Sequence, residues 1–305
     1  NVVFSSLGLV ITDEQHRFGV KQRQALESKG KSPHVLIMTA TPIPRTMALS
    51  VYGDLDVSFI KGMPPGRHPV KTYVVGSHML QRIFRFMKKE MESGHQAYVV
   101  CPLVEQSEKQ DLAAAVSVYE NLRDHVFPQF GVGLVHGRMK NAEKEQVMED
   151  FRKGKFKLLV ATSVIEVGVN VPDATVMFVY GADRFGLSQL HQLRGRVGRG
   201  SAPSTCILVS DAQNDEAKRR FDIMCKTTDG FLIADEDLKM RGSGEIFGTR
   251  QSGIPEFQVA DIVEDYNILE EARRVASQIV SDPNWRENPD WQVLGAHLRS
   301  QGEFD

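Results

Sequence analysis

The sequence predicts an α/β fold in which a parallel sheet is flanked by helices. Short apolar runs, which are typical of buried strands, alternate along the chain with longer stretches of helical periodicity. The alternation restarts after a proline- and glycine-rich segment at residues 62–67, and the strand-like runs stop near residue 210. We therefore expect three parts: the end of one α/β domain with a linker at 1–66, a complete second α/β domain at 67–210, and a mostly helical C-terminal extension at 211–305.

The first part holds two expected strands, at residues 7–12 and 35–39, because each is a short apolar run that ends at polar residues. A helix is expected over residues 46–52 and a short strand over 57–60. Because the chain begins inside a strand-like pattern, it resembles a fragment. Two strands without their neighbours leave open edges and an unburied face, so we expect residues 1–60 to be partly disordered, rearranged or packed against another molecule.

In the second part, strands and helices alternate regularly. Each expected strand is a short run rich in aliphatic residues, and each expected helix is an amphipathic stretch. The expected strands are residues 70–75, 96–101, 132–135, 157–161, 175–179 and 205–210, and the expected helices are 78–93, 111–127, 141–153 and 187–197. In the third part, glycine-rich breaks between helices at 242–253 precede a long helix at 260–281.

The composition is that of an ordinary globular protein. Hydrophobic residues make up 41% and charged residues 25% of the 305 residues, and the net charge is −2. Any contact with nucleic acid must therefore come from locally placed cations. The cysteines, Cys101, Cys206 and Cys225, are scattered without metal-binding spacing, so we expect buried thiols in a reducing compartment. No apolar run is long enough to span a bilayer, and the first residues do not resemble a signal peptide.

The first chemical motif is DEQH, residues 13–16, at the end of an apolar strand. Carboxylates at the carboxyl end of a parallel strand lie where ligands of such folds bind. An adjacent acidic pair there suits Mg²⁺-nucleotide chemistry, with Asp13 holding the ion and Glu14 polarising the attacking water. The same residues also fit a solvated helix start, where acidic side chains are favoured.

A second motif, TATP at residues 39–42, also follows an apolar strand. The hydroxyls of Thr39 and Thr41 could link a nucleotide pocket to a neighbouring surface. The simpler interpretation is that Thr41 caps the helix that follows.

The strongest signal is QLRGRVGR, residues 192–199, which has three arginines, two glycines and no acid inside an expected helix. Each glycine costs a helix about 1 kcal/mol relative to alanine, so close approach is required there. Arg196 and Arg199 are three residues apart, which places both guanidiniums on one helix face. Such a pair suits the spread negative charge of a γ-phosphate. Arginines paired with surface acids are the alternative.

Two further segments with polar residues directly follow expected strands. The segment ATSVIEVGVNVP, residues 161–172, presents hydroxyls, including that of Thr162, at an expected helix start, where free amides favour phosphate. The segment HGRM, residues 136–139, follows the strand at 132–135. His136 could act as a general base, although a histidine at a strand end more often forms a local hydrogen bond.

Together these segments resemble the motifs of superfamily 2 helicases and translocases. DEQH resembles motif II, TAT motif III, HGRM motif IVa, ATSVIEVGVNVP motif V and QLRGRVGR motif VI, with matching order and spacing from residue 13 to residue 199. Within the superfamily, residues 39–60, the MPPGR linker and MRGSGEIFGTRQSG at 240–253 resemble the RecG family most closely. The transcription-repair coupling factor shares the last of these elements.

The resemblance implies a motor of two RecA-like lobes with ATP and Mg²⁺ between them. Residues 1–66 would be the remnant of lobe 1 with motifs II and III, residues 67–210 would be lobe 2, and residues 211–305 would include the translocation motif. Asp13, which would hold Mg²⁺ through ATP, and Glu14 would come from lobe 1. Arg196 and Arg199 would reach across from lobe 2 as arginine fingers.

Further roles are implied motif by motif. Nucleotide sensing would fall to His16, Gln192 and Gly168; contact with DNA, or coupling to it, to Thr39, Thr41, His136, Gly137 and Thr162; and the translocation motif would contain Arg241, Arg250 and Gln251.

The implied activity is that of an ATP-dependent DNA helicase. It would remodel branched double-stranded DNA, such as stalled forks and Holliday junctions, in recombination and repair in the bacterial cytoplasm. No membrane partner is expected. The sequence does not determine the oligomeric state, and a monomeric motor is the expectation.

Three departures from the family pattern qualify this. The ATP-binding P-loop pattern, GxxxxGK[ST], occurs nowhere in the 305 residues, and the wedge domain that recognises branched DNA is absent. Asn170 stands where motif V commonly has aspartate. The chain by itself is therefore expected to lack ATPase activity. A nucleic-acid-binding half-motor and a relative of the coupling factor remain alternatives, whereas an RNA helicase fits less well because DEQH and the glycine-rich tail resemble the DNA-directed branch.

Overall fold

The computed structural model describes residues 2–13, 29–30, 32–39, 57–60, 62–64, 66–102, 108–162, 170–241, 265–285 and 288–300. The chain divides into two compact units, one of residues 1–43 with 59–240 and the other of residues 44–58 with 241–305. The division expected from the sequence, with boundaries at 66 and 210, stays a prediction.

The first two strands form a small parallel sheet. β1 (Leu9–Asp13) pairs with β2 (His34–Met38) in parallel, in a register that sets Asp13 beside Met38. Apolar side chains on both strands remain exposed, among them Ile11 at 56%. The unburied face expected from the sequence is therefore confirmed.

The segment Val57–Ile60 was expected to be a strand, and this prediction is wrong. The described residues 57–60 form no ladder with another strand. Instead the ring of Phe59 packs edge-on against that of Phe231, with centroids 5.4 Å apart. Aromatic contact therefore replaces backbone pairing here. The helix expected at 46–52 lies outside the described residues.

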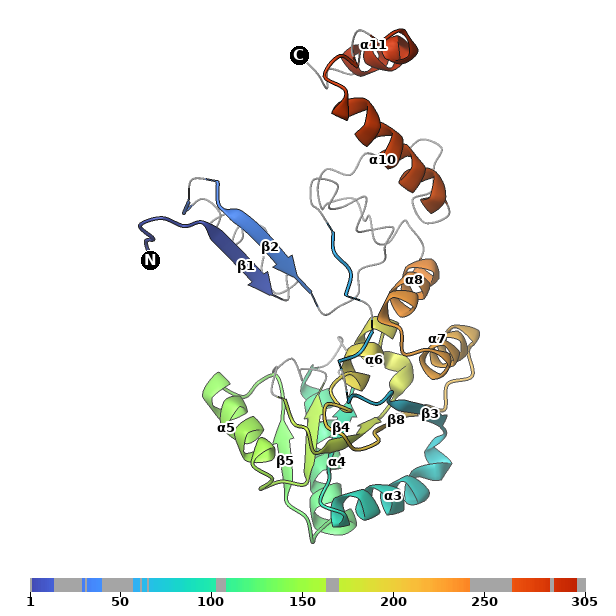
Figure 1. The fold of residues 1–305 in the computed structure, drawn as a ribbon. Coiled ribbons are helices and arrows are strands. Elements are labelled where there is room, and N and C mark those ends of the chain that lie inside the picture. Colours follow the sequence, from blue (N-terminus) through green and yellow to red (C-terminus); the bar gives the residue numbers. More distant parts are fainter. Residues whose placement is uncertain are drawn as a thin grey trace. The chain divides into compact units, whose positions relative to one another are not determined.

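The larger sheet of the first unit is a six-stranded parallel sheet (Figure 1). All of its ladders are parallel, which confirms the α/β class predicted from the sequence. Its spatial order is β3 (Lys71–Val75), β8 (Thr205–Val209), β7 (Ala174–Val179), β4 (Gln96–Cys101), β6 (Leu158–Thr162) and β5 (Val132–Val135).

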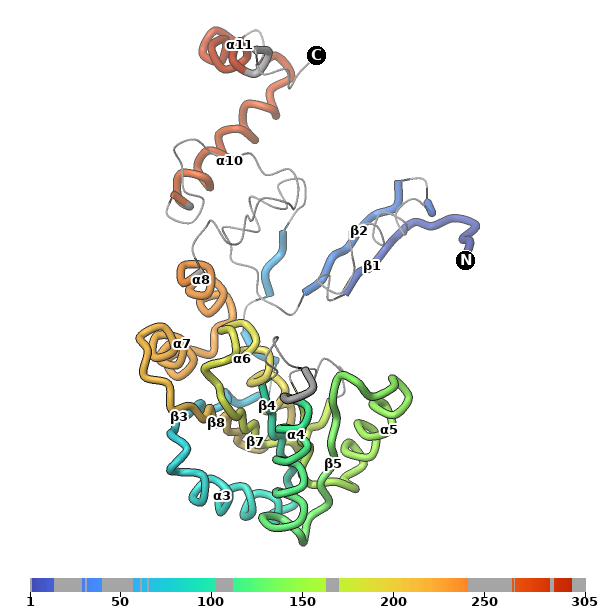
Figure 2. Tube along the Cα trace, turned by 180° about the vertical axis from the view of Figure 1, so that it is seen from behind, coloured from blue at the N-terminus to red at the C-terminus, as the bar shows by residue number. Residues whose placement is uncertain are grey.

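Helices cover both faces of this sheet (Figures 1 and 2). The helices are α3 (Leu80–Glu92), preceded by the short 3-10 turn η2 (Ser77–Met79), α4 (Glu108–Asn121), which continues as a π-helical turn over Leu122–Val126, α5 (Asn141–Arg152), α6 (Leu187–Arg194), α7 (Asp215–Lys226) and α8 (Gly230–Arg241). One core layer joins α3 and α4 to the sheet, and the other joins α5, α6, α7 and α8 to its opposite face.

Strand β4 shows how the sequence produces these two layers. All six of its residues are buried, as expected for a central parallel strand. Ala97, Val99 and Cys101 belong to the α3–α4 layer, whereas Tyr98 and Val100 belong to the layer under α5–α8. The alternation follows from the two-residue period of a strand.

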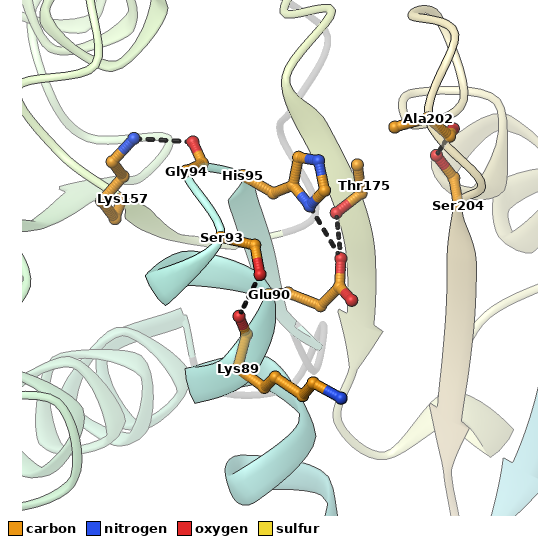
Figure 3. A network of polar contacts seen from close by, with 9 residues as sticks. All are labelled: Lys89, Glu90, Ser93, Gly94, His95, Lys157, Thr175, Ala202 and Ser204. Atoms are coloured by element: carbon orange, nitrogen blue, oxygen red, sulfur yellow. Dashed lines mark hydrogen bonds and ion pairs between the residues drawn. The ribbon is translucent and has the colours of Figure 1, made fainter.

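Polar groups at the amino ends of β4 and β7 are satisfied by specific partners (Figure 3). Glu90 Oε2, on α3, accepts a hydrogen bond from Thr175 Oγ1 at 3.0 Å and lies 3.0 Å from His95 Nδ1. The buried Gln96 amide donates to the carbonyls of Phe151, at 2.6 Å, and Phe156, at 2.8 Å. These bonds tie α3, α5 and the central strands together at one end of the sheet.

The second unit contributes helices to the described part of the chain. They are α10 (Tyr266–Ser281), the 3-10 turn η5 (Pro289–Trp291) and α11 (Gln292–Ser300). The long helix expected at 260–281 is confirmed over its described part. Among the described residues, no helix combines the length and apolar character needed to cross a membrane.

Replacing Gln96 with methionine tests the buried amide. The substitution keeps the volume but removes both donors, so the carbonyls of Phe151 and Phe156 lose a partner inside the core. We expect the free energy of unfolding to fall by roughly 1–3 kcal/mol, measured by urea unfolding followed by circular dichroism. Gln81→Met, at an exposed position of α3, is the control and should change little; equal stability of the Gln96 variant and the wild type would contradict the role of this amide.

Candidate functional site

The carboxyl edge of the small sheet brings together two residues expected from the sequence. Asp13 is the last residue of β1, and Thr39 directly follows β2. Because the strands are parallel and Asp13 is in register with Met38, both side chains belong to the same edge. Glu14, His16 and Thr41 lie outside the described residues.

The arginine motif is not helical where the sequence predicted it to be. Helix α6 ends at Arg194, and Gly195 is its C-cap. Gly198 has φ +71°, and a Cβ there would lie 2.8 Å from Val70 Cγ2, so both conformation and space require glycine. The expectation that Arg196 and Arg199 share one helix face is therefore wrong. They lie instead on a loop, residues 195–200, which we call the arginine loop.

A third arginine holds this loop. Arg67, which follows the Pro-Gly linker, donates from Nε to the Gly198 carbonyl at 2.9 Å and from its terminal nitrogen to the Gly195 carbonyl at 3.5 Å. Arg199 Nε donates to the Gly195 carbonyl as well, at 3.2 Å. Sequence reasoning assigned Arg67 only to the linker. Its position directly after a chain-reversing Pro-Gly segment was the available signal.

The arginine loop concentrates positive charge. Burial, and then the neighbouring charges of Arg196 and Arg67, hold the pKa of Arg199 below its usual range. In the part of the chain that the structure describes, none of these three guanidiniums forms an ion pair with a carboxylate. Beneath the loop, burial raises the pKa of Tyr98 to about 12, although Arg196 and Arg199 oppose that rise. An anion bound at this loop would relieve the repulsion between the arginines.

Arg194, in the same motif, has a different role. It is 3% exposed and donates to the carbonyls of Met224, at 2.7 Å, and Thr227, at 2.9 Å, where helix α7 ends. A cation at a helix C-terminus satisfies free carbonyls and complements the helix dipole. The apolar periodicity of α6 was the signal for this, since Arg194 continues the buried series of Leu187 and Leu190. Gln192 lies on the exposed side of the helix.

The carboxyl edge of the large sheet holds a second group of expected residues. Val135 and Ala161 are partners in the β5–β6 ladder, so the residues that follow them, His136 and Thr162, occupy corresponding positions at this edge. Both side chains have a buried polar atom without a hydrogen-bond partner, Nδ1 of His136 and Oγ1 of Thr162. Unpaired buried polar atoms are costly, so this edge is a candidate site for a group that would satisfy them.

The environment of His136 is cationic. Burial, and then the charges of Lys144 and Arg138, hold the pKa of His136 below its ordinary value. Lys144 Nζ donates to the Gly137 carbonyl at 2.9 Å and so fixes the turn to helix α5. The cations Lys144 and Arg138 make this part of the sheet edge suited to an anionic group.

The other residues expected from the sequence lie at a helix end, at an exposed position or outside the described residues. Arg241 is the last residue of α8, and Asn170 is exposed. Gly168, Arg250 and Gln251 lie outside the described residues.

Comparison with known families matches two parts of the chain. The family model for the helicase conserved C-terminal domain matches residues 78–201, which contain most of the six-stranded sheet. The family model for "ATP-dependent DNA helicase RecG, domain 3, C-terminal" matches residues 227–303.

Curated relatives are similar over the whole chain. The ATP-dependent DNA helicase RecG of Streptococcus pneumoniae serotype 4 is 55% identical over 304 residues, and that of Bacillus subtilis strain 168 is 53% identical over 305. Both alignments cover 100% of this chain and 45% of the relative, so the chain spans less than half the length of these proteins.

Solved structures agree with this. The structure of RecG bound to a three-way DNA junction has 46% sequence identity and a TM-score of 0.68, and the match covers 88% of this chain and 34% of that one. The helicase MrfA bound to DNA and AMPPNP has a TM-score of 0.53 at 14% identity, which shows a common fold alone. The six-stranded sheet thus has the RecA-like fold of a helicase C-terminal lobe, and the chain matches the C-terminal part of the RecG helicases, as the sequence motifs predicted.

Proposed function

We propose that this chain forms the second motor lobe of an ATP-dependent DNA helicase that remodels branched DNA, such as stalled forks and Holliday junctions, in recombination and repair. The observation that carries the proposal is the arginine loop, where Arg67, Arg196 and Arg199 meet without an acidic partner among the described residues. Three guanidiniums in this arrangement require an anion of high charge, and a nucleoside triphosphate provides one.

The roles at the nucleotide follow from this geometry. Arg196 and Arg199 would stabilise charge on the γ-phosphate, and Arg67 would hold their loop through the carbonyls of Gly195 and Gly198. Asp13, at the end of its strand, would hold Mg²⁺, which proteins bind through one or two carboxylates together with substrate phosphates. ATP supplies the free energy of hydrolysis for the motor. Glu14 as the residue that polarises water, and His16, Gln192 and Gly168 as nucleotide sensors, remain proposals from the motifs.

The DNA would lie along the carboxyl edge of the large sheet. His136, Gly137 and Thr162 present polar groups there, two of them with unsatisfied atoms. Contacts of this kind reach the phosphate backbone and therefore give little sequence preference and a strong dependence on salt. The structure of a RecG bound to a three-way junction supports branched DNA as the ligand. Coupling through Thr39, Thr41, Arg241, Arg250 and Gln251 is likewise proposed.

A second candidate concerns the chain by itself. Since the P-loop pattern is absent from the 305 residues, we propose that this chain alone binds nucleic acid without hydrolysing ATP. Turnover by the purified chain above background, with or without forked DNA, would contradict that. The named relatives are bacterial, which supports a bacterial cytoplasmic protein; we propose a monomeric motor.

Arg196→Ala tests the arginine-finger role in a complete helicase that contains this chain. We expect DNA-stimulated ATP hydrolysis to fall by about 10³-fold or more, because the developing charge loses its stabiliser, while junction binding stays nearly intact. A coupled ATPase assay and an anisotropy titration measure the two effects. Arg123→Ala, at an exposed arginine paired with Asp124, is the matched control. Normal ATP turnover in the Arg196 variant would contradict the arginine-finger role.

Thr162→Val tests the carboxyl edge and separates binding from stability. Removing an unpaired buried hydroxyl should leave the free energy of unfolding unchanged or raise it by about 1 kcal/mol, yet weaken the affinity for a three-way junction several-fold. Thr175→Val is the control, because its equally buried hydroxyl donates to Glu90. That variant should lose stability and keep its affinity. Unchanged junction affinity in the Thr162 variant would count against a DNA contact at this edge.

A further inference from the structure

Several helices in the described part of the chain pair their surface cations with nearby acids. On α5 and just beyond it, Arg152 and Lys153 pair with Glu149, and Lys155 pairs with Asp150. The same holds on other helices, where the pairs are Lys218–Asp215, Arg219–Glu236, Lys226–Asp222, Lys239–Glu236 and Arg274–Glu271. Paired charges of this kind leave a weak local field.

Helix α3 departs from this rule. Arg82, Arg85 and Lys89 are exposed, and none of them forms an ion pair within the described part of the chain. They are spaced by three and four residues and therefore form one stripe, opposite the buried Ile83 and Met87. The ion pair that α3 does form, Lys88–Glu92, at 3.8 Å, also leaves these three cations uncompensated.

Edge strand β3 adds exposed residues on the side of the sheet that α3 covers. β3 is the outermost strand of the large sheet at one side. Its Val75 packs into the α3–α4 core layer, so Lys71 and Tyr73, four and two residues earlier, face the same side of the sheet as α3. Lys71 is exposed, and the Tyr73 ring is 51% exposed. We call these five residues, Lys71, Tyr73, Arg82, Arg85 and Lys89, the α3–β3 surface.

Acidic groups beside the α3–β3 surface are already engaged. Asp211 Oδ1 accepts a hydrogen bond from the Ser77 backbone amide at 2.9 Å, at the start of the turn that leads into α3. Glu92 is paired with Lys88. Asp211 keeps its charge in this bond, but Lys71, Arg82, Arg85 and Lys89 outnumber it, so the surface carries a positive field although the whole chain has a net charge of −2.

The shape of the surface favours a nucleic-acid backbone over an acidic peptide. The stripe from Arg82 to Lys89 is about 10 Å long at 1.5 Å per helical residue. That length spans about three successive phosphates at roughly 3.4 Å of rise each. An exposed aromatic ring beside cations is the arrangement that binds unpaired bases by stacking.

The location fits a segment of nucleic acid separate from the one at the carboxyl edge. β3 and β5 are the two outer strands of the sheet, as Figure 1 shows. Five strand spacings of about 4.8 Å put them roughly 24 Å apart, more than the width of one duplex groove. His136 follows β5, whereas Lys71 and Tyr73 of the α3–β3 surface lie on β3.

We propose that the α3–β3 surface binds a second arm of the branched DNA, including unpaired bases where that arm opens. This inference rests on the proposed function, because a second surface is useful to a protein whose ligand has more than one arm. Arg82, Arg85, Lys89 and Lys71 contact phosphates, and Tyr73 stacks on a base.

The test compares two triple variants of this chain that lose the same charge. Arg82→Gln, Arg85→Gln and Lys89→Gln remove the stripe, whereas Arg152→Gln, Lys153→Gln and Lys155→Gln remove paired cations elsewhere. Binding to a labelled three-way junction is followed by fluorescence anisotropy over a range of KCl concentrations. We expect the first variant to bind about 10-fold more weakly at low salt, with a salt slope shallower by about 2.7 for three lost phosphate contacts. The second should resemble the wild type.

Several outcomes would overturn the inference. They are an unchanged affinity and slope in the stripe variant, an equal loss in the matched variant, an equal loss on a linear duplex of the same length, and competition by polyglutamate as effective as that by DNA. Tyr73→Ala should weaken binding to a junction with a single-stranded arm more than to a fully paired one; an equal effect on both would remove the stacking role. Circular dichroism confirms that each variant is folded.

The same titrations distinguish this inference from the proposed function. If Thr162→Val weakens binding and the stripe variant does not, the DNA contact at the carboxyl edge is supported and DNA binding by the α3–β3 surface is contradicted. If the stripe variant alone weakens binding, the DNA contact at the carboxyl edge is contradicted and DNA binding by the α3–β3 surface is supported.

Discussion

The end of helix α6 is the constraint on which the arginine loop depends. Glycines at 195 and 198 stop the helix and turn the chain, with Gly198 at a φ of +71° that other residues rarely adopt. The turn exposes carbonyls that Arg67 and Arg199 then bind. Without it the chain would continue as a helix, its carbonyls would bond internally, and Arg67 would have nothing to hold. A few backbone dihedrals thus decide where three guanidiniums meet.

The treatment of charge differs sharply between regions of the protein. Most helices place acids three or four residues from their cations, which leaves little net field. The arginine loop lacks such compensation within the described residues, and so do Arg82, Arg85 and Lys89 on helix α3. Repulsion among like charges destabilises the fold slightly, and its persistence at two places indicates sites for anions rather than a general property of the surface. Net charge, which is −2 for the whole chain, conceals both.

The sheet could be predicted from the sequence because its signals are local. Each central strand is an uninterrupted apolar run, and parallel strands buried on both faces require such a run. The edge group of His136 and Thr162 followed from the same pattern, since strand ends reveal the ligand-binding edge. The motif order identified the family. What failed was local backbone geometry: the glycines in QLRGRVGR were interpreted as tolerated within a helix, whereas they end it. The Arg67 contacts, which join residues 128 and 131 positions apart, have no local signature at all.

Arg194 and Arg196 are two residues apart in one motif but lie in different structural environments. Arg194 is buried and closes the end of α7, so its loss would act on folding. Arg196 belongs to the arginine loop, so under the proposed function we expect its loss to act on ATP hydrolysis instead. Inactive variants in this motif therefore belong to two diagnostic classes, separable by the quantity of folded protein recovered. Variants of the first class give less folded protein, although each folded molecule has normal activity. Low temperature or a chaperone could rescue them. The second gives a normal yield of molecules that do not turn over, and no folding aid would restore them.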